Sequence, residues 1–385
     1  MLEGTNIAIG ITGSIAAVKV VEIIHELRRR GANVRGIITS NATKIIHPWS
    51  IEFATGNAVV TNITGSVEHI ELCGFNGWAD VLVIVPATAN TIGKMAASID
   101  DTPVTTCVTT AIGSKIPIVV APAMHEPMAN HPGIIEAQMR LESWGLKFVS
   151  PIIEEGKAKV ADIETIITEI ERAIDEKPLL GKHIIVTSGA TYERIDPVRV
   201  ITNSSSGKTG YGIARGCYIK GAKVSLIHNG MEIPYMNTYQ VDSSAEMIDC
   251  VLKLAENADG LVSVAAIADY GIEALENKIK STKTEIELKL FKRPKLLDVV
   301  REKFPDLLMI GFKAEMEKDQ EIMIGHAREL LKRVNLSFVV ANDTEMIGLD
   351  DTEVLVVREK NVIELKGPKK DVGLAIAEEI SKEIS

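Results

Sequence analysis

The sequence predicts an α/β protein made of two Rossmann-like, doubly wound domains. Short apolar, β-branched segments alternate with amphipathic segments along its 385 residues, as parallel strands alternate with crossover helices. A chain of this length exceeds one ordinary core. A charged stretch containing proline and glycine at 175–181 separates two runs of this pattern. We therefore place the domains at residues 1–178 and 179–385.

The first domain opens with a βαβ pattern, whose parallel strands need the helix as a crossover. A strand is predicted over Asn6–Ile11, then a helix from about residue 15 to 30, in which apolar residues recur at helical spacing, and a second strand over Asn33–Thr39. Two further β-branched runs, Val81–Val85 and Ile118–Ala121, are each stopped by a proline. They predict buried central strands.

The second domain repeats this opening, with a strand over His183–Thr187 and a helix over about residues 210–220. The segment that follows the helix, 221–224, is similar to 31–34. We interpret this as the same strand–helix–strand connection occurring in two doubly wound domains rather than as a true sequence repeat. The later predicted elements are strands at Leu261–Ala266 and Phe338–Ala341, a hairpin from Glu353–Val357 and Val362–Leu365, and a closing helix at Asp371–Ile384.

Composition limits the function classes. The formal net charge of −10 argues against a nucleic-acid-binding protein, which would need a basic face. The four cysteines are scattered and form no Cys-x-x-Cys pair, which indicates reduced thiols in the cytoplasm. The N-terminus lacks a basic signal region, and no apolar run is long enough to span a bilayer. Neither export nor membrane insertion is therefore expected.

Two loops of the first domain are candidates for binding a ligand. Thr12-Gly13-Ser14 lies between a strand and a helix, where backbone N–H groups favour an anion, although Ser14 could simply cap the helix. The loop is not Gly-x-Gly-x-x-Gly, which argues against a standard NAD site. In Pro86–Thr91, small residues allow a flat ligand to approach, although Thr88 or Asn90 could be an ordinary helix cap.

Four segments of the first domain match one family in order: Gly13–Ala17, His69–Leu72, Ala87–Thr91 and Pro122–Met124. Together they resemble the homo-oligomeric flavin-containing cysteine decarboxylases. A lone histidine is more often structural, but the resemblance implies that His69 is the catalytic base. It also implies an FMN cofactor, which provides the electron sink that loss of CO₂ requires. The implied FMN-binding residues are Gly13, Ser14, Ile15, Thr39, Ala87, Thr88 and Asn90.

The first domain departs from this family at two positions. The family usually carries asparagine after Pro-x-Met to bind the substrate carboxylate, whereas here Met124 is followed by His125, which could donate to the same group. The family's flexible lid usually carries a cysteine that acts as an acid, but the equivalent stretch 154–161 has none. Either Lys157 or Lys159 supplies the proton, or the reductive half-reaction is altered.

Two segments of the second domain suit a nucleotide. Asn203–Gly210 is rich in hydroxyls and glycine and leads into a helix, so it could wrap phosphates. It is not a full Walker A loop, because Thr202 stands where the first glycine would be, and a flexible serine-rich loop is the alternative. The lysine-rich stretch 278–295 suits a triphosphate, although it could also be a solvated hairpin that protects a sheet edge.

The second domain matches a ligase family in order, through 196–199, 203–208, 265–270, 278–280, 292–294, 311–315 and 341–343. These motifs resemble the phosphopantothenate–cysteine ligases. The resemblance implies that Asn203 holds an acyl-cytidylate made from CTP, and that cysteine then displaces CMP. The implied nucleotide-binding residues are Ala265, Asp269, Lys278, Pro294, Lys295, Leu296, Leu297, Phe312, Arg328 and Lys332. The substrate-binding residues that we expect in the two domains are Met124, His125, Ser206, Gly207 and Lys208.

The two domains together resemble bifunctional fusions that catalyse successive steps of coenzyme A biosynthesis. The expected substrates are 4'-phosphopantothenate, L-cysteine and CTP, with Mg²⁺ or Mn²⁺ bridging the triphosphate; no carboxylate cluster identifies the metal ligands. The resemblance also implies a homo-oligomer, with trimers of the flavin domain and dimers of the ligase domain. The alternatives are an NAD-dependent oxidoreductase, a flavin-binding module without chemistry, and a chain in which only the ligase is active.

Overall fold

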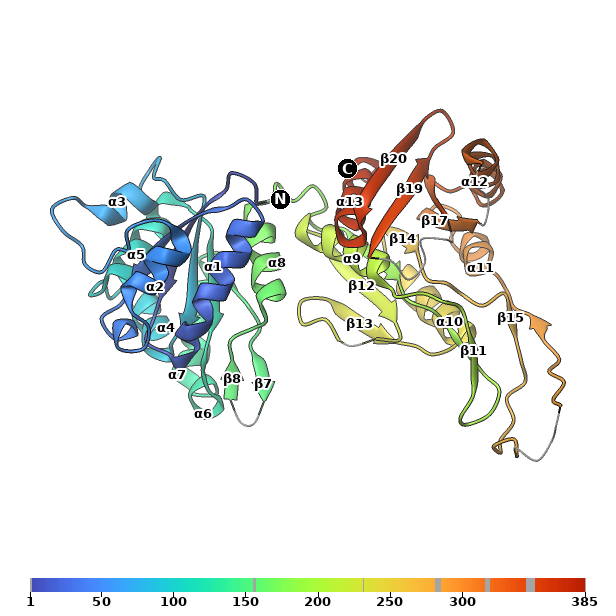
Figure 1. Ribbon diagram of the computed structural model, residues 1–385, viewed down its shortest axis with the longest axis horizontal. Coiled ribbons are helices and arrows are strands. Elements are labelled where there is room, and N and C mark those ends of the chain that lie inside the picture. Colours follow the sequence, from blue (N-terminus) through green and yellow to red (C-terminus); the bar gives the residue numbers. More distant parts are fainter. Residues whose placement is uncertain are drawn as a thin grey trace. The chain divides into compact units, whose positions relative to one another are not determined.

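The structure is a computed structural model that describes residues 2–154, 157–230, 232–280, 285–315, 319–343 and 350–384. It divides into two compact units, Met1–Asp175 and Glu176–Ser385 (Figure 1), and each is described by itself. Each unit has a mainly parallel sheet with helices on both faces. The predicted α/β class with two doubly wound units is confirmed. No helix within the described ranges is long and apolar enough to cross a membrane.

The first unit contains a five-stranded parallel sheet in the order β2-β1-β3-β4-β6. Successive residues of the first strand point to opposite faces, because Ile7 and Ile9 pack in one core and Ala8 packs in the other. The strands are β1 (Asn6–Ile11), β2 (Asn33–Ile38), β3 (Val81–Ala87), β4 (Ile118–Pro122) and β6 (Lys147–Phe148).

Helices cover both faces of this sheet. The core of one face contains residues of α1 (Val20–Arg29), α2 (Pro48–Thr55) and α8 (Ile163–Ile174). The core of the other contains residues of α3 (Glu68–Cys73), α4 (Ala89–Ala96), α5 (Pro103–Ser114) and α7 (Pro132–Ser143). The remaining short helices are η1 (Ile15–Lys19), η2 (Ala42–Lys44) and α6 (Glu126–Ala129).

Three details of the first unit differ from the prediction. β3 continues through Pro86 to Ala87, and β4 includes Pro122. Both prolines lie at the carboxyl ends of their strands, where the register between β3 and β4 already shifts, so few ladder bonds are lost. The helix predicted from residue 15 begins as the 3-10 turn η1 before α1, as helix N-termini often do.

A small antiparallel sheet follows the main one, with strand order β5-β8-β7. β5 (Met124–His125) comes directly after β4, and it pairs with β8 (Lys157–Lys159), which in turn pairs with β7 (Ile152–Glu154). The segment expected to be the lid therefore pairs with the chain that leaves β4.

The second unit contains an eight-stranded sheet in the order β13-β12-β9-β14-β17-β18-β19-β20. Its first six strands are parallel. The last two form an antiparallel hairpin with Val357 opposite Val362, which confirms the predicted hairpin. The strands are β9 (His183–Thr187), β12 (Lys223–His228), β13 (Asn237–Gln240), β14 (Gly260–Ser263), β17 (Leu308–Glu315), β18 (Phe338–Asp343), β19 (Asp351–Val357) and β20 (Val362–Pro368).

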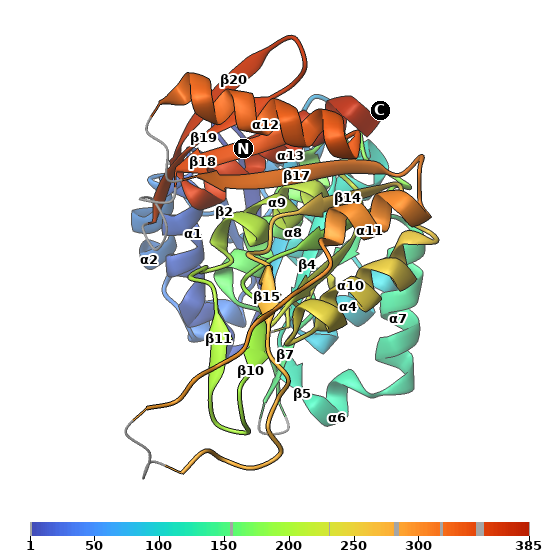
Figure 2. The ribbon, with the colours of Figure 1, turned by 90° about the vertical axis from the view of Figure 1, so that its right-hand side faces the viewer.

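The helices of the second unit also lie on both faces, and Figure 2 shows α12 along the β17–β18 end of the sheet. One core contains residues of α9 (Lys208–Ile219) and α13 (Lys369–Ile384), and the other contains residues of α10 (Ser244–Ala255), α11 (Leu296–Lys303) and α12 (Gln320–Val334). Two short ribbons complete the unit: β10 (Tyr192–Arg194) with β11 (Val200–Thr202), and β15 (Tyr270–Gly271) with β16 (Phe291–Lys292).

Candidate active sites

The first candidate site lies where the chain leaves β1 and β3 toward opposite faces of the sheet. These strands are neighbours, but α1 follows β1 onto one face, whereas α4 and α5 follow β3 onto the other. Ligands of doubly wound folds bind at this kind of switch point, outside the carboxyl ends of the strands. The loops after β1 and β3, which the sequence singled out, therefore lie at the expected edge.

The two loops are joined directly. Thr12 Oγ1 donates to the carbonyl oxygen of Pro86 at 2.6 Å and accepts from the Thr88 N–H at 3.1 Å. A Cβ on Gly13 would lie 2.8 Å from the Cβ of Asn41. The chain therefore passes so close to the turn after β2 that a side chain does not fit at Gly13 without movement.

The hydroxyl groups at this edge also cap helices, as the alternative interpretation expected. Ser14 Oγ accepts from the Ala16 N–H at 3.4 Å, and Thr88 Oγ1 accepts from the Thr91 N–H at 3.3 Å. Thr39, at the end of β2, is buried, and its hydroxyl accepts from Ala42. Asn90 is exposed, as is Ile15, whose side chain has a relative exposure of 76%. Capping and ligand binding are compatible, because a hydroxyl that accepts one bond can still donate another.

His69 lies in the first turn of α3, which packs against α5. Its Nδ1 is buried, and the described part of the chain offers that nitrogen no hydrogen-bond partner. Buried polar atoms in native proteins are almost always paired, so an orphaned one calls for an explanation such as an absent ligand or a catalytic role.

His125 and Met124, the expected substrate contacts of the first unit, form β5. His125 is exposed, and the backbone pairing places it opposite Lys157 of β8. The side chain of Lys157 lies outside the described part of the structure.

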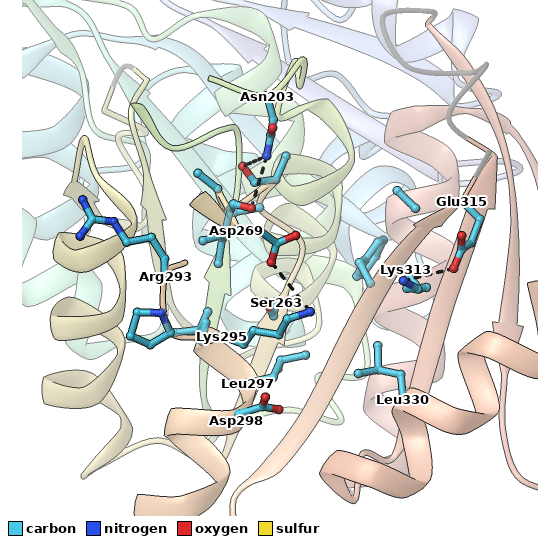
Figure 3. A pocket seen from close by; sticks show the side chains of 18 of the residues that line it. Asn203, Ser263, Asp269, Arg293, Lys295, Leu297, Asp298, Lys313, Glu315 and Leu330 are labelled. Carbon is cyan, nitrogen blue, oxygen red and sulfur yellow. Dashed lines mark hydrogen bonds and ion pairs between the residues drawn. The ribbon is translucent and has the colours of Figure 1, made fainter. Parts of the chain in front are cut away.

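The second unit contains a cavity of about 1360 Å³ at the carboxyl edge of its sheet (Figure 3). The cavity brings together eight residues that the sequence assigned to ligation or nucleotide binding. These are Asn203, Ala265, Asp269, Pro294, Lys295, Leu296, Leu297 and Phe312. They come from four segments that are far apart in the sequence, and their convergence is a result of the sheet topology.

Hydrogen bonds and ion pairs organise the wall of this cavity. The Asn203 amide Nδ2 donates to the carbonyl oxygens of Ala266 and Ile267, each at 3.3 Å. The Lys295 ammonium lies 3.8 Å from the Asp269 carboxylate (Figure 3). On the opposite side, the Glu315 carboxylate lies 3.1 Å from the Lys313 ammonium, and it also contacts a histidine of α12. The wall thus carries one lysine on each of two sides, each paired with a carboxylate.

A smaller cavity of about 160 Å³ shares part of this wall and contains Ser206, Gly207 and Lys208. Gly207 has φ +72°, and its carbonyl oxygen accepts from Ser188 Oγ at 2.8 Å, so the serine-rich loop is tied to the end of β9. Lys369, at the start of α13, also lines this cavity. Burial lowers the pKa of Lys369, and the nearby Lys208 lowers it further.

Three expected nucleotide contacts do not line the large cavity. Lys278 is exposed in the segment between β15 and β16, and on α12 Arg328 is half-buried while Lys332 is exposed. The face of α12 that lines the cavity carries His326, Glu329, Leu330 and Arg333 instead. These positions recur at the spacing of one helical face.

The sequence could have predicted this face of α12. Its buried residues are Met323, Ala327, Leu331 and Val334, which fix the side turned to the core. The sequence did not indicate that Lys369 lies near the serine-rich loop, because about 160 residues separate them. The parallel packing of α9 and α13 brings Lys369 next to this loop.

The segment that holds Lys278 is anchored by a buried carboxylate. Asp196 accepts from the backbone N–H groups of Ile279, Val198 and Arg199 at 3.0, 2.8 and 2.8 Å, and it pairs with the Arg199 guanidinium. The bond from Ile279, with the other donors, holds the pKa of Asp196 well below its usual range. Asp196 therefore joins the β10–β11 ribbon to the lysine-rich segment.

No group of three His, Cys, Asp or Glu side chains that could hold a metal ion occurs among the residues that the structure describes.

The fold and these two edges define a protein with two separate ligand-binding α/β units. Family models cover both: one described as "Flavoprotein" matches residues 1–175, and one described as "DNA/pantothenate metabolism flavoprotein C-terminal domain" matches residues 179–384. The flavoprotein match decides against the NAD-dependent oxidoreductase considered from the sequence.

Whole-chain relatives carry both units. The coenzyme A biosynthesis bifunctional protein CoaBC of Thermococcus kodakarensis is 45% identical over 363 residues, which cover 92% of this chain and 89% of the relative. The proteins of the same name from Methanocaldococcus jannaschii and Bacillus subtilis are 38% and 30% identical, and the matches cover 99% of this chain and 94% and 98% of those relatives. The chain belongs to the family of bifunctional coenzyme A biosynthesis proteins CoaBC. It is a bifunctional enzyme in which a flavoprotein decarboxylase unit precedes a ligase unit.

Proposed function

We propose that the second unit joins 4'-phosphopantothenate to L-cysteine with CTP, and that the first unit decarboxylates the product, phosphopantothenoylcysteine, with FMN. The observation that carries the ligase proposal is the cavity in which Asn203 hydrogen-bonds the segment before Asp269 and cations lie on two sides. The cavity volume of about 1360 Å³ is large enough for a nucleotide together with a second substrate.

In the ligase reaction, the substrate carboxylate attacks the α-phosphorus of CTP, and pyrophosphate leaves. Lys295 and Lys313 line the cavity and would neutralise triphosphate charge, to which a divalent cation, Mg²⁺ or Mn²⁺, would add charge neutralisation. Asp269 can accept from the exocyclic amine of cytosine, which would favour CTP over uridine nucleotides. Asn203 holds the acyl-cytidylate while the cysteine amine displaces CMP. Ser206, Gly207 and Lys208 supply hydroxyl, N–H and cationic groups to the phosphate-bearing end of a substrate.

In the decarboxylase reaction, Gly13–Ile15, Thr39, Ala87, Thr88 and Asn90 would hold FMN, which would supply a transient two-electron oxidation of the cysteinyl group before CO₂ is lost and return the same electrons afterwards. The residues fit such a cofactor, because Thr12 joins the two hydroxyl-bearing loops at this edge and the His69 Nδ1 has no protein partner in the described chain. His69 acts as the base. His125 donates to the substrate carboxylate. Lys157 returns the proton that the family's lid cysteine would supply.

We further infer a homo-oligomer in the cytoplasm. Ile15, Trp49 and Phe53 are strongly exposed on the first unit, and Tyr270 and Leu275 are exposed on the second. Trp49 and Phe53 lie four residues apart on α2, so they share one helix face that contact between subunits would bury. We expect trimeric contacts of the flavin units and dimeric contacts of the ligase units, and the molar mass of the intact protein from light scattering tests this assembly.

Paired variants test the division of labour. Incubation with 4'-phosphopantothenate, cysteine and CTP allows pyrophosphate and CO₂ to be followed together. His69→Asn is expected to abolish CO₂ release from phosphopantothenoylcysteine and to leave pyrophosphate release intact, whereas Asn203→Asp is expected to do the reverse. If either variant lost both activities while remaining folded, the assignment of one reaction to each unit would be wrong. Replacement of CTP by ATP in the same assay tests the nucleotide preference.

A further inference from the structure

The backbone just before His69 has an unfavourable conformation. Val67 has φ +50° and ψ +48°, the left-handed region. A β-branched residue rarely adopts this conformation, because its Cβ substituents crowd the backbone. The other non-glycine residues with positive φ in the described chain are Asn, Ser or Lys. Val67 is 49% exposed, so packing in the core does not explain why a valine occupies this position.

A local clasp holds this conformation in place. We use this name for the side-chain and backbone bonds between Thr64 and Glu68. The Glu68 carboxylate accepts from the Thr64 N–H at 2.8 Å and from Thr64 Oγ1 at 2.5 Å, and the Val67 N–H donates to the Thr64 carbonyl oxygen at 3.1 Å. These bonds from Thr64 favour the charged carboxylate and lower the pKa of Glu68.

Val67 in turn sets the direction of the first turn of α3. Its carbonyl oxygen accepts from the N–H groups of Ile70 at 2.8 Å and Glu71 at 3.2 Å. The far end of the helix is fixed separately, because Glu71 pairs with Arg35 at 2.7 Å and the guanidinium of Arg35 stacks over Trp78. His69 therefore lies between two anchors, and the anchor at its N-terminal side depends on a strained residue.

Two unfavourable features thus stand two residues apart: a strained backbone at Val67 and a buried Nδ1 without a partner at His69. Strained residues and orphaned polar atoms both concentrate at functional sites, where the surrounding structure imposes them. We propose that the left-handed backbone at Val67, held by the Thr64–Glu68 clasp, fixes the position of the His69 ring for proton transfer. Val67 and Glu68 are positioning residues in this inference, which rests on the proposed role of His69 in decarboxylation.

Substitutions at Val67 separate backbone geometry from side-chain identity. Val67→Gly relieves the strain and lets the turn adopt other conformations, so we expect kcat for CO₂ release to fall about tenfold, with KM within about twofold. Val67→Asn keeps a residue that tolerates the left-handed region, so its kcat should stay within about twofold of the parent. The bound flavin absorbance and pyrophosphate release are expected to be unchanged in both.

Lys115→Gly is the matched control. Lys115 is exposed with φ +61° at the C-terminal end of α5, at the opposite edge of the sheet from the candidate flavin site. The substitution likewise places a glycine at a left-handed position, and it should leave kcat for CO₂ release unchanged. Equal losses of kcat in Lys115→Gly and Val67→Gly would overturn the inference, because they would indicate a general effect of flexibility.

The clasp is tested by a double-mutant cycle of Thr64→Val and Glu68→Ala. Thr64→Val removes the hydroxyl bond and keeps the backbone bond, whereas Glu68→Ala removes both, so each should lower kcat, and the double variant should lose little more than Glu68→Ala alone. Additive losses, or a Val67→Gly enzyme with kcat within about twofold of the parent, would overturn the positioning role. Undiminished CO₂ release in His69→Asn would instead show that the proposed function of His69 is wrong, so the two failures are distinguishable.

Discussion

His125 and Lys157 lie opposite each other across the antiparallel pair of β5 and β8. Opposite residues of such a pair have Cα atoms about 4.5–5.5 Å apart. The pairing attaches the segment expected to be the lid to the strand that carries the expected carboxylate-binding histidine. If His125 binds the substrate carboxylate, the lid backbone therefore lies beside the group that leaves as CO₂.

Substitution of His125 by alanine tests this relationship. A hydrogen bond to a charged group contributes about 1.5–3 kcal/mol, so His125→Ala should raise KM for phosphopantothenoylcysteine about tenfold. Because the side chain is exposed, the melting temperature should hardly change. CO₂ release over a range of substrate concentrations measures the effect. His25→Ala, which removes an exposed histidine of α1, is the control, and an unchanged KM in His125→Ala would exclude the contact.

Removal of the Lys295 ammonium should weaken nucleotide binding. Lys295 lines the large cavity 3.8 Å from Asp269, where it can approach a phosphate. We expect Lys295→Ala to raise KM for CTP about tenfold, which corresponds to about 1.4 kcal/mol. Pyrophosphate release at varied CTP measures it. Lys289→Ala is the control, because that ammonium lies over the Phe291 ring and does not line the cavity. Equal effects of both variants would point to overall charge instead.

Asp196→Asn should destabilise the ligase unit in a pH-dependent way. The pKa of Asp196 is lowered in the folded protein, so its charge stabilises the fold above the unfolded pKa of about 3.9. That stabilisation is lost as the pH falls through the lower, folded pKa. The melting temperature of the variant should therefore be lower than that of the parent at pH 7, and the difference should shrink in strong acid.

Calorimetry across this pH range makes the measurement, and Asp242→Asn provides the comparison. Asp242 forms an ion pair with Arg194 at 2.5 Å, and both side chains are substantially exposed. Exposed pairs contribute little, about 0–1 kcal/mol. A difference for Asp196→Asn that stayed constant with pH would contradict a role for its charge.

Two glycine substitutions should have opposite effects on the stability of the second unit. A Cβ on Gly373 would lie 2.6–2.8 Å from backbone atoms of Gly212 and Ile213, where α9 and α13 pack, so Gly373→Ala should destabilise the unit by about 1–3 kcal/mol. A Cβ on Gly325, inside α12, would meet nothing within 4 Å, so Gly325→Ala should stabilise it by about 0.5–1 kcal/mol. Urea unfolding followed by circular dichroism measures the change in the free energy of unfolding for both variants. An unchanged free energy of unfolding in Gly373→Ala would mean that α9 and α13 can move apart to admit the methyl group.

Removal of divalent cations should separate the two activities. In the proposed ligase reaction the cation is expected to arrive with the triphosphate, because Mg²⁺ in nucleotide sites binds largely through substrate phosphates. Excess chelator should therefore stop pyrophosphate release and leave CO₂ release from phosphopantothenoylcysteine unchanged, and added Mg²⁺ or Mn²⁺ should restore ligation. Ligation that continued in chelator would rule out a metal-bridged nucleotide.

Local pattern predicted much of the first candidate site. The strand before Thr12 and the strand before Ala87 were visible as β-branched runs, and their loops carry the small and hydroxyl residues that now lie tied together through Thr12 Oγ1. The second of these predicted strands stopped at Pro86, whereas β3 continues to Ala87. Proline interrupts a strand only where the sheet needs a hydrogen bond from its N–H, and the sequence does not show whether that bond is needed.

The rotation of α12 about its axis determines which of its residues line the large cavity. The sequence suggested Arg328 and Lys332, which share one face by their spacing, whereas the cavity is lined by His326 and Arg333. Charge spacing alone cannot show which face of a helix turns to a ligand. The burial of residues such as Ala327 and Leu331 against the sheet fixes it.

The sequence alone determined the alternation of strands and helices, the two-part organisation and the motifs that resemble a flavin-dependent decarboxylase and a ligase, because these depend on short-range periodicity and local residue chemistry. Tertiary structure decided which loops share an edge. Asn203 reaches the carbonyl of Ala266, His125 faces Lys157, and Lys369 lines the same small cavity as Ser206. Strand order and helix packing arise from contacts between residues far apart in the chain, and no local pattern encodes them.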